Sequence, residues 1–275
     1  MNNVFNPKSI NSIVTYAKKL KNKTLRQACG AEIENHGYKG KGNFGQLIEK
    51  FYFGYEPNSK AEADFVDVGM ELKCTPLKTL KKGDFRSKER LVLNIINYLE
   101  VHQEKFETSS FWKKNAHLLL VFYLHDRDLD LLDYLIKLVE GWQYPKEDLK
   151  IIKQDWEFIN QKIKKGKAHE LSEGDTFYLG ACTKGSTAIK SFRDQPFNEE
   201  KAKQRAYSLK QGYVNHIIAN IAKEETAVYG KIIEQPEILE KVRSIEEIVV
   251  SKFRPFYGKY AEKIEQKLGL ELNKN

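Results

Sequence analysis

The 275-residue chain lacks long apolar runs, has only three cysteines and contains no paired histidine motif. Its apolar stretches, such as residues 117–124, fall well short of the roughly 20 residues that cross a bilayer, so no membrane partner is expected. The N-terminus does not show the charged and then apolar pattern of a secretory signal. We therefore expect a cytoplasmic protein.

Cysteine and histidine chemistry are not indicated. Cys29, Cys74 and Cys182 are far apart and show no CxxC spacing, which argues against a disulfide framework and against a zinc site. The six histidines form no HxxxH pair. In contrast, charge is abundant: 46 Lys and Arg against 38 Asp and Glu give a net charge of +8. This excess suits a polyanionic partner, although a solvated lysine-rich surface explains it equally well.

Hydrophobic periodicity predicts a mixed α/β protein. The patterns predict helices over residues 9–20, 22–28, 44–52, 91–99, 129–140, 146–164 and 213–223, and strands over 67–76, 117–124 and 177–181. From about residue 236 the chain is rich in Lys and Glu. We predict a domain over residues 1–235, followed by a segment over 236–275 that is either a helical tail or linker or the start of a second related domain.

The strand predicted over residues 67–76 carries a candidate active site. Side chains two residues apart in a strand share a face, so Glu71 and Lys73 lie opposite the core-facing Met70, Leu72 and Cys74. With Asp64 upstream and Glu49 on the preceding helix, they form an acid-rich set with one cation. Mg²⁺ takes carboxylate oxygens, water and phosphate oxygens as ligands, so this set suits metal-assisted phosphodiester hydrolysis. On pattern alone, a solvated strand edge explains the same spacing.

Two later segments are candidates for DNA contact. A polar turn containing Thr183, Lys184 and Gly185 follows the strand predicted over residues 177–181, and it suits either entry into a DNA groove or an ordinary surface turn. Residues 201–213 interleave basic, aromatic and hydroxyl side chains, including Tyr207, Ser208 and Lys210. That mixture is typical of phosphate and base contacts, and a basic helix face is a further interpretation.

Several motifs in order resemble the MutH family, which comprises a mismatch-repair nicking endonuclease and restriction endonucleases that cut at GATC. KGNFGQLIE at residues 41–49 is similar to the family's KGxxGxLLE helix. ADF at 63–65 and VGMELKCTP at 68–76 are similar to its DFxxLGVELKTIP strand. DWE at 155–157, YL and TK around 178–184, and RAYSLK at 205–210 resemble its DWE, YLxxRPK and RGFYLK segments. The likeness spans residues 12–220.

This resemblance implies a PD-(D/E)xK restriction-endonuclease-like fold, in which helices flank a central mixed sheet. It makes Asp64, Glu71 and Lys73 the catalytic residues, with Asp64 and Glu71 on Mg²⁺ and Glu49 as supporting acid. It places Lys41 near the scissile phosphate, and a further lysine at Lys113 or Lys114, of which we select Lys114 as a DNA contact. The loop of Thr183, Lys184 and Gly185 would read the bases.

Two departures bear on the activity that the resemblance implies. Cys182 and Thr183 replace the Arg-Pro before Lys184, and Ser208 stands where the mismatch-repair enzyme has the tyrosine that senses adenine methylation. We therefore predict a type II restriction endonuclease that makes double-strand cuts in DNA at GATC. It would act as a homodimer or with a second DNA-binding half. The alternatives are a mismatch-repair nicking endonuclease and an inactive, sequence-specific DNA-binding module.

Overall fold

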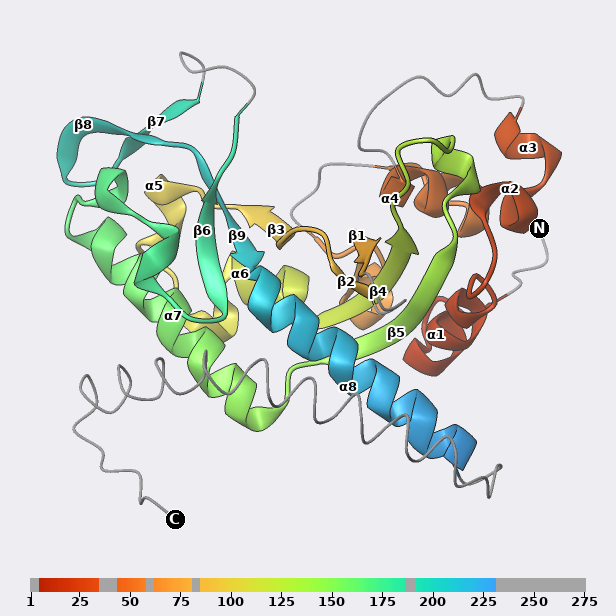
Figure 1. The fold of residues 1–275 in the computed structure, drawn as a ribbon. Helices are drawn as coiled ribbons and strands as arrows, with labels where there is room; N and C mark the ends of the chain where they lie inside the picture. Colours follow the sequence, from red (N-terminus) through yellow and green to blue (C-terminus); the bar gives the residue numbers. More distant parts are fainter. Residues whose placement is uncertain (1–4, 35–43, 58–61, 81–84, 186–190, 231–275) are drawn as a thin grey trace. The chain divides into compact units, whose positions relative to one another are not determined.

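The computed structural model describes residues 5–34, 44–57, 62–80, 85–185 and 191–230, and the side chains of those before residue 224 (Figure 1). The chain divides into two compact units, Met1–Ala219 and Asn220–Asn275. The boundary predicted between residues 235 and 236 lies outside the described residues and stays a prediction. Among the described helices, none is long and apolar enough to cross a membrane.

Short capped helices open the chain. The helices predicted over residues 9–20 and 22–28 are present as α1 (Ile10–Lys18), which Ser9 caps, and α2 (Leu25–Cys29), which begins at a reciprocal Thr24–Gln27 capping box. α3 (Ala31–Glu34) follows. The helix predicted over residues 44–52 is present in two parts, α4 (Phe44–Leu47) and the π-helical η1 (Ile48–Tyr52), which carries Glu49.

A four-stranded mixed sheet supports the predicted site. It contains β1 (Met70–Thr79), β2 (Phe85–Ser87), β4 (His117–Leu124) and β5 (Ile136–Gln143), in the order β2-β1-β4-β5. β1 and β4 are parallel and pair Glu71 with Leu118, whereas the outer two pairings are antiparallel. Buried residues of the N-terminal helices and of this sheet share one hydrophobic cluster that includes Ile13, Ile48 and Leu119.

A second, antiparallel sheet has the order β3-β9-β6, from β3 (Leu91–Ile95), β9 (Arg205–Leu209) and β6 (Leu179–Thr183). A separate hairpin joins β7 (Phe192–Gln195) and β8 (Asn198–Lys203). The remaining helices are α5 (Tyr98–Val101), α6 (Ser110–Asn115), α7 (Lys146–Lys164) and α8 (Gln211–Gly230). Single 3₁₀ turns are η2 (Val66–Val68), η3 (Phe106–Thr108), η4 (Leu131–Asp133), η5 (Ala168–Glu170) and η6 (Glu173–Asp175).

Two predicted helices are wrong. Residues 91–99 form β3 and then α5, which begins after the Asn97 cap, and residues 129–140 form η4 and then the first part of β5. In both segments the apolar spacing fits either period, and pairing with a neighbouring strand decides. β1 also begins at Met70 rather than at residue 67, and residues 201–203 and 205–209 lie in strands rather than on a basic helix face.

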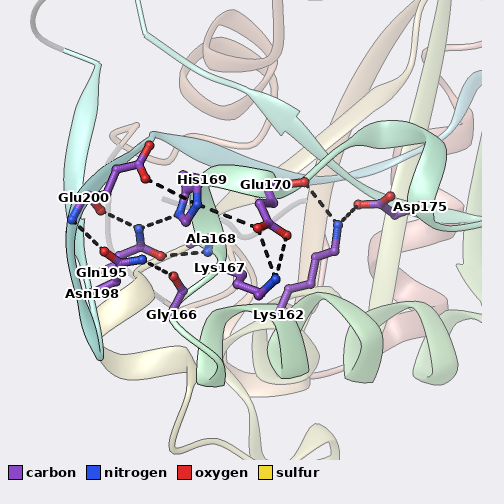
Figure 2. A network of polar contacts seen from close by, with 10 residues as sticks. All are labelled: Lys162, Gly166, Lys167, Ala168, His169, Glu170, Asp175, Gln195, Asn198 and Glu200. Atoms are coloured by element: carbon purple, nitrogen blue, oxygen red, sulfur yellow. Dashed lines mark hydrogen bonds and ion pairs between the residues drawn. The ribbon is translucent and has the colours of Figure 1, made fainter.

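Polar side chains attach the β7–β8 hairpin to the η5 turn (Figure 2). Gln195, which is 5% exposed, accepts a hydrogen bond from the Ala168 backbone N–H at 2.7 Å and donates one to the Glu200 carbonyl. Asn198 donates to the Gly166 carbonyl at 2.8 Å, and Lys162 on α7 donates to Asp175 at the same distance. The hairpin is therefore held to the Gly166–Ala168 segment by two side chains, the buried Gln195 and the exposed Asn198.

The carboxylate of Asp155 on α7 fixes the start of β6. It accepts hydrogen bonds from the backbone N–H groups of Phe177, Tyr178 and Leu179 at 2.8, 2.6 and 2.8 Å. The side chain is 3% exposed, and this burial raises its pKa while the three donors oppose the shift. Asp155 therefore acts on the segment that leads into the predicted base-reading turn.

We expect Asp155→Ala to lower the free energy of unfolding by about 2–4 kcal/mol, because three buried backbone donors lose their charged acceptor. Glu157→Ala, at an exposed position on the same helix, should change it by no more than about 0.5 kcal/mol. Urea unfolding followed by circular dichroism measures both values. Equal, small effects would contradict the role assigned to Asp155.

Candidate active site

The predicted acids and lysine converge at the start of β1. Lys73 Nζ donates a hydrogen bond to Glu71 Oε1 at 2.6 Å, and the backbone N–H of Asp64 donates to Glu71 Oε2 at 3.2 Å. In return, the backbone N–H of Leu72 donates to Asp64 Oδ2 at 2.9 Å. The structure thus brings Asp64, Glu71 and Lys73 together, and it adds two backbone donors that no side-chain pattern in the sequence could indicate.

A second lysine reaches the same carboxylate from α6. Lys114 Nζ lies 3.5 Å from Glu71 Oε1 and donates to the Glu62 carbonyl at 2.9 Å. Parallel pairing of β1 with β4 explains this position, because it sets the α6 segment that precedes β4 beside the start of β1. Lys113, in contrast, is exposed. Of the two lysines left open by the sequence, the structure therefore places Lys114 at the acid cluster.

Carboxylate repulsion and burial shape the electrostatics. Burial, followed by the charges of Asp64 and Glu71, raises the pKa of Glu49 from 4.5 to about 7. Burial and then Glu71 raise the pKa of Asp64 from 3.8 to about 6. The Glu71 side chain is only 4% exposed, and the side chains of Lys73 and Lys114 are 16% and 14% exposed. The cluster therefore has acids that favour a bound cation.

The donor set suits a hard cation held by few protein ligands. Within the described part of the chain, no three Asp, Glu, His or Cys side chains form a complete metal-ligand group. Asp64 and Glu71 nevertheless offer two carboxylates, which backbone hydrogen bonds hold near each other. Mg²⁺ commonly binds through one or two carboxylates and keeps several waters, which substrate phosphate oxygens can replace. These residues fit Mg²⁺, with Glu49 as an outer acid rather than a third ligand.

Besides Lys114, the predicted DNA contacts form three groups: Lys41, the turn of Thr183 to Gly185, and the segment from Tyr207 to Lys210. Lys41 lies outside the described residues. Thr183, Lys184 and Gly185 are exposed at the end of β6, as a base-reading turn requires, and their contact with DNA stays a prediction. Gly185 has a φ of +134°, and a Cβ there would lie 2.5 Å from the Ser191 Cβ, so this turn requires glycine.

The structure buries two of the three remaining candidates for DNA contact, Tyr207, Ser208 and Lys210. Tyr207 and Ser208 are 0% and 1% exposed, because β9 is the central strand of its sheet. The Tyr207 ring packs against Phe111, with 5.1 Å between centroids. Lys210 is partly buried, and its ammonium group donates to the Thr176 carbonyl. Lys210 thus helps to fix the Thr176–Leu179 segment together with Asp155, and its predicted DNA contact stays a prediction.

The mixed sheet, its flanking helices and the acid–lysine cluster on β1 define a restriction-endonuclease-like fold. Residues 53–155 match the family model described as DNA mismatch repair enzyme MutH. Together with the relatives described next, this match identifies residues 53–155 as a MutH-family domain.

Curated relatives carry two kinds of name. The chain is 45% identical over 228 residues to the type II restriction enzyme Sau3AI of Staphylococcus aureus, in an alignment that covers 82% of this chain and 46% of that protein. It is 29% identical over 175 residues to the DNA mismatch repair protein MutH of Shewanella amazonensis, covering 62% of this chain and 76% of that protein. For MutH of Shewanella woodyi the identity is 28% over 189 residues, covering 66% and 78%. This chain thus spans less than half of the restriction enzyme.

The raised pKa values predict the pH dependence of stability without metal. The folded protein holds protons on Glu49 and Asp64 more tightly than the unfolded chain does, so their contribution is present below about pH 4 and is lost as the pH rises through about 6 and 7. In EDTA, the free energy of unfolding should fall more between pH 5 and 8 for the wild type than for the Glu49→Gln/Asp64→Asn double variant.

Urea unfolding at several pH values measures this difference. Glu157→Gln, which removes an exposed carboxylate from α7, should keep the wild-type slope. An identical slope in the double variant would show that the two acids do not titrate as assigned.

Proposed function

We propose that this chain is a nuclease that hydrolyses phosphodiester bonds in double-stranded DNA with Mg²⁺ as its cofactor. The observation that carries the proposal is the convergence of Asp64, Glu71, Lys73 and Lys114 at the start of β1. The names of the relatives, a restriction enzyme and mismatch-repair proteins, support the same class of substrate. The net charge of +8 suits a polyanion.

Each residue has a defined part in this proposal. Asp64 and Glu71 hold Mg²⁺, which when bound lowers the pKa of water and neutralises charge on the phosphate. Lys73 positions or deprotonates the attacking water and stabilises the phosphate oxygens, and Lys114 adds a second positive charge beside them. Glu71 accepts the Lys73 hydrogen bond, so Glu71 orients the Lys73 ammonium group. Glu49 remains a supporting acid.

We further propose a type II restriction activity with double-strand cuts at GATC. Identity to the restriction enzyme is 45%, against 29% for a mismatch-repair relative, and Ser208 replaces the tyrosine of the repair enzyme. Cutting both strands requires two active sites or two binding events, which a homodimer or a second DNA-binding half supplies. The exposed turn of Thr183, Lys184 and Gly185 reads the bases.

Unmethylated plasmid DNA tests the activity of the chain. Incubation with MgCl₂ and no partner protein should give linear products whose sequenced ends lie at GATC. Nicked circles alone would favour the mismatch-repair type of activity. Intact plasmid would contradict nuclease activity of this chain and favour a DNA-binding module.

Lysine variants test the assigned centre. Lys73→Ala should lower the cleavage rate by at least about 100-fold, because a charge that stabilises the transition state is lost. Lys114→Ala should also slow cleavage, whereas Lys113→Ala, its exposed neighbour on α6, should stay within about twofold of the wild type. Gel-shift assays in EDTA should show DNA binding by all three variants. Unchanged cutting by Lys73→Ala would overturn the assignment.

A further inference from the structure

A small backbone loop joins the two proposed metal ligands. Phe65 and Met70 form an isolated antiparallel bridge, in which the Phe65 N–H donates to the Met70 carbonyl at 2.9 Å and the Met70 N–H donates to the Phe65 carbonyl at 3.3 Å. The η2 turn fills the loop, and Gly69 ends it. Asp64 and Glu71 are the chain neighbours of the two bridge residues. The bridge therefore fixes the backbone positions from which both side chains extend.

Two reciprocal hydrogen bonds extend the bridge onto the carboxylates. The Asp64 N–H donates to Glu71, and the Leu72 N–H donates to Asp64. Each carboxylate is therefore held by a backbone donor from the other end of the loop. These backbone donors offset the repulsion between the two carboxylates without a bound cation. We call residues 64–72 the acid latch.

Aromatic packing anchors the acid latch on the segment that directly follows the Glu49 helix. Phe65 is 2% exposed, and its ring centroid lies 5.0 Å from that of Phe53 and 5.4 Å from that of Tyr55. The Tyr55 N–H donates to the Glu49 carbonyl at 2.8 Å. Met70 is also 2% exposed. Both bridge residues are thus packed in the core, and the turn between them connects the two sides of the bridge.

Gly69 is the residue on which that turn depends. Its φ of 61° and ψ of 36° lie in the left-handed region, which L side chains adopt at a cost. A Cβ at this position would meet no atom within 4 Å, so a substitution tests the backbone conformation and not steric room. Gly30, at the end of α2, also has a positive φ, of 64°. A Cβ there would likewise meet no atom within 4 Å.

We propose that the acid latch holds Asp64 and Glu71 in their metal-binding arrangement before the metal arrives, and that Gly69 is its positioning residue. This inference rests on the proposed Mg²⁺ site. It explains why two acids that repel each other can share a buried strand end. Because the arrangement exists in advance, metal binding need not order the loop, and this favours affinity.

Hydrogen exchange tests the latch without metal. In EDTA, a peptide covering residues 64–72 should be protected in the wild type, since four of its N–H groups are donors in the bonds described above. Gly69→Ala should raise its exchange rate at least about tenfold, whereas Gly30→Ala should leave it unchanged. Gly69→Asn should restore protection, because asparagine tolerates the left-handed region. Unprotected wild-type amides would overturn the proposal.

A measurement of Mg²⁺ affinity tests whether the acid latch supports the proposed metal site. We expect the MgCl₂ concentration that half-saturates the rise in melting temperature to increase at least about fivefold in Gly69→Ala. It should return to within about twofold of the wild type in Gly69→Asn and stay there in Gly30→Ala, even where that variant lowers the melting temperature. A protected latch with unchanged affinity in Gly69→Ala would overturn the proposal. No MgCl₂ response in the wild type would refute the proposed metal site instead, and with it this inference.

Discussion

Repulsion among carboxylates is the constraint around which this structure is arranged. Glu49, Asp64 and Glu71 lie close enough that each of the first two has a pKa raised by its acidic neighbours as well as by burial. Two ammonium groups and two backbone N–H groups offset this repulsion at Asp64 and Glu71. The protein thus keeps three carboxylates close together at the start of a buried strand, with two ammonium groups beside them.

The sheet supplies these partners through its topology. A parallel pair brings the starts of two strands together, so β4 sets the lysine of α6 beside the acids of β1 although the two segments are about forty residues apart. The N-terminal helices support the same strands, because their buried residues belong to one hydrophobic cluster with those of β1 and β4. Position in the fold, rather than proximity in the sequence, assembles the site.

Sequence patterns predict the parts of this site that depend on local period. The alternation from Met70 to Cys74 places Glu71 and Lys73 on one face, and β4 and α7 have the predicted bounds. The choice between Lys113 and Lys114 depends on the phase of α6, which two adjacent lysines cannot reveal. Tyr207 and Ser208 resemble surface residues by composition, yet strands on both sides bury them. Long-range pairing also turned the predicted helix over residues 91–99 into β3 and α5.

The proposed cutting and reading residues belong to sheets that share no strand: the acids and Lys73 depend on β1, and Thr183 to Gly185 on the end of β6. Asp155 and Lys210 hold the entrance of β6 through backbone atoms, and this support makes no demand on the side chains of the turn itself. In a nuclease of this design, a lineage can exchange the turn residues and acquire a new target sequence while it inherits the hydrolytic centre intact. Specificity and chemistry can then evolve at different rates.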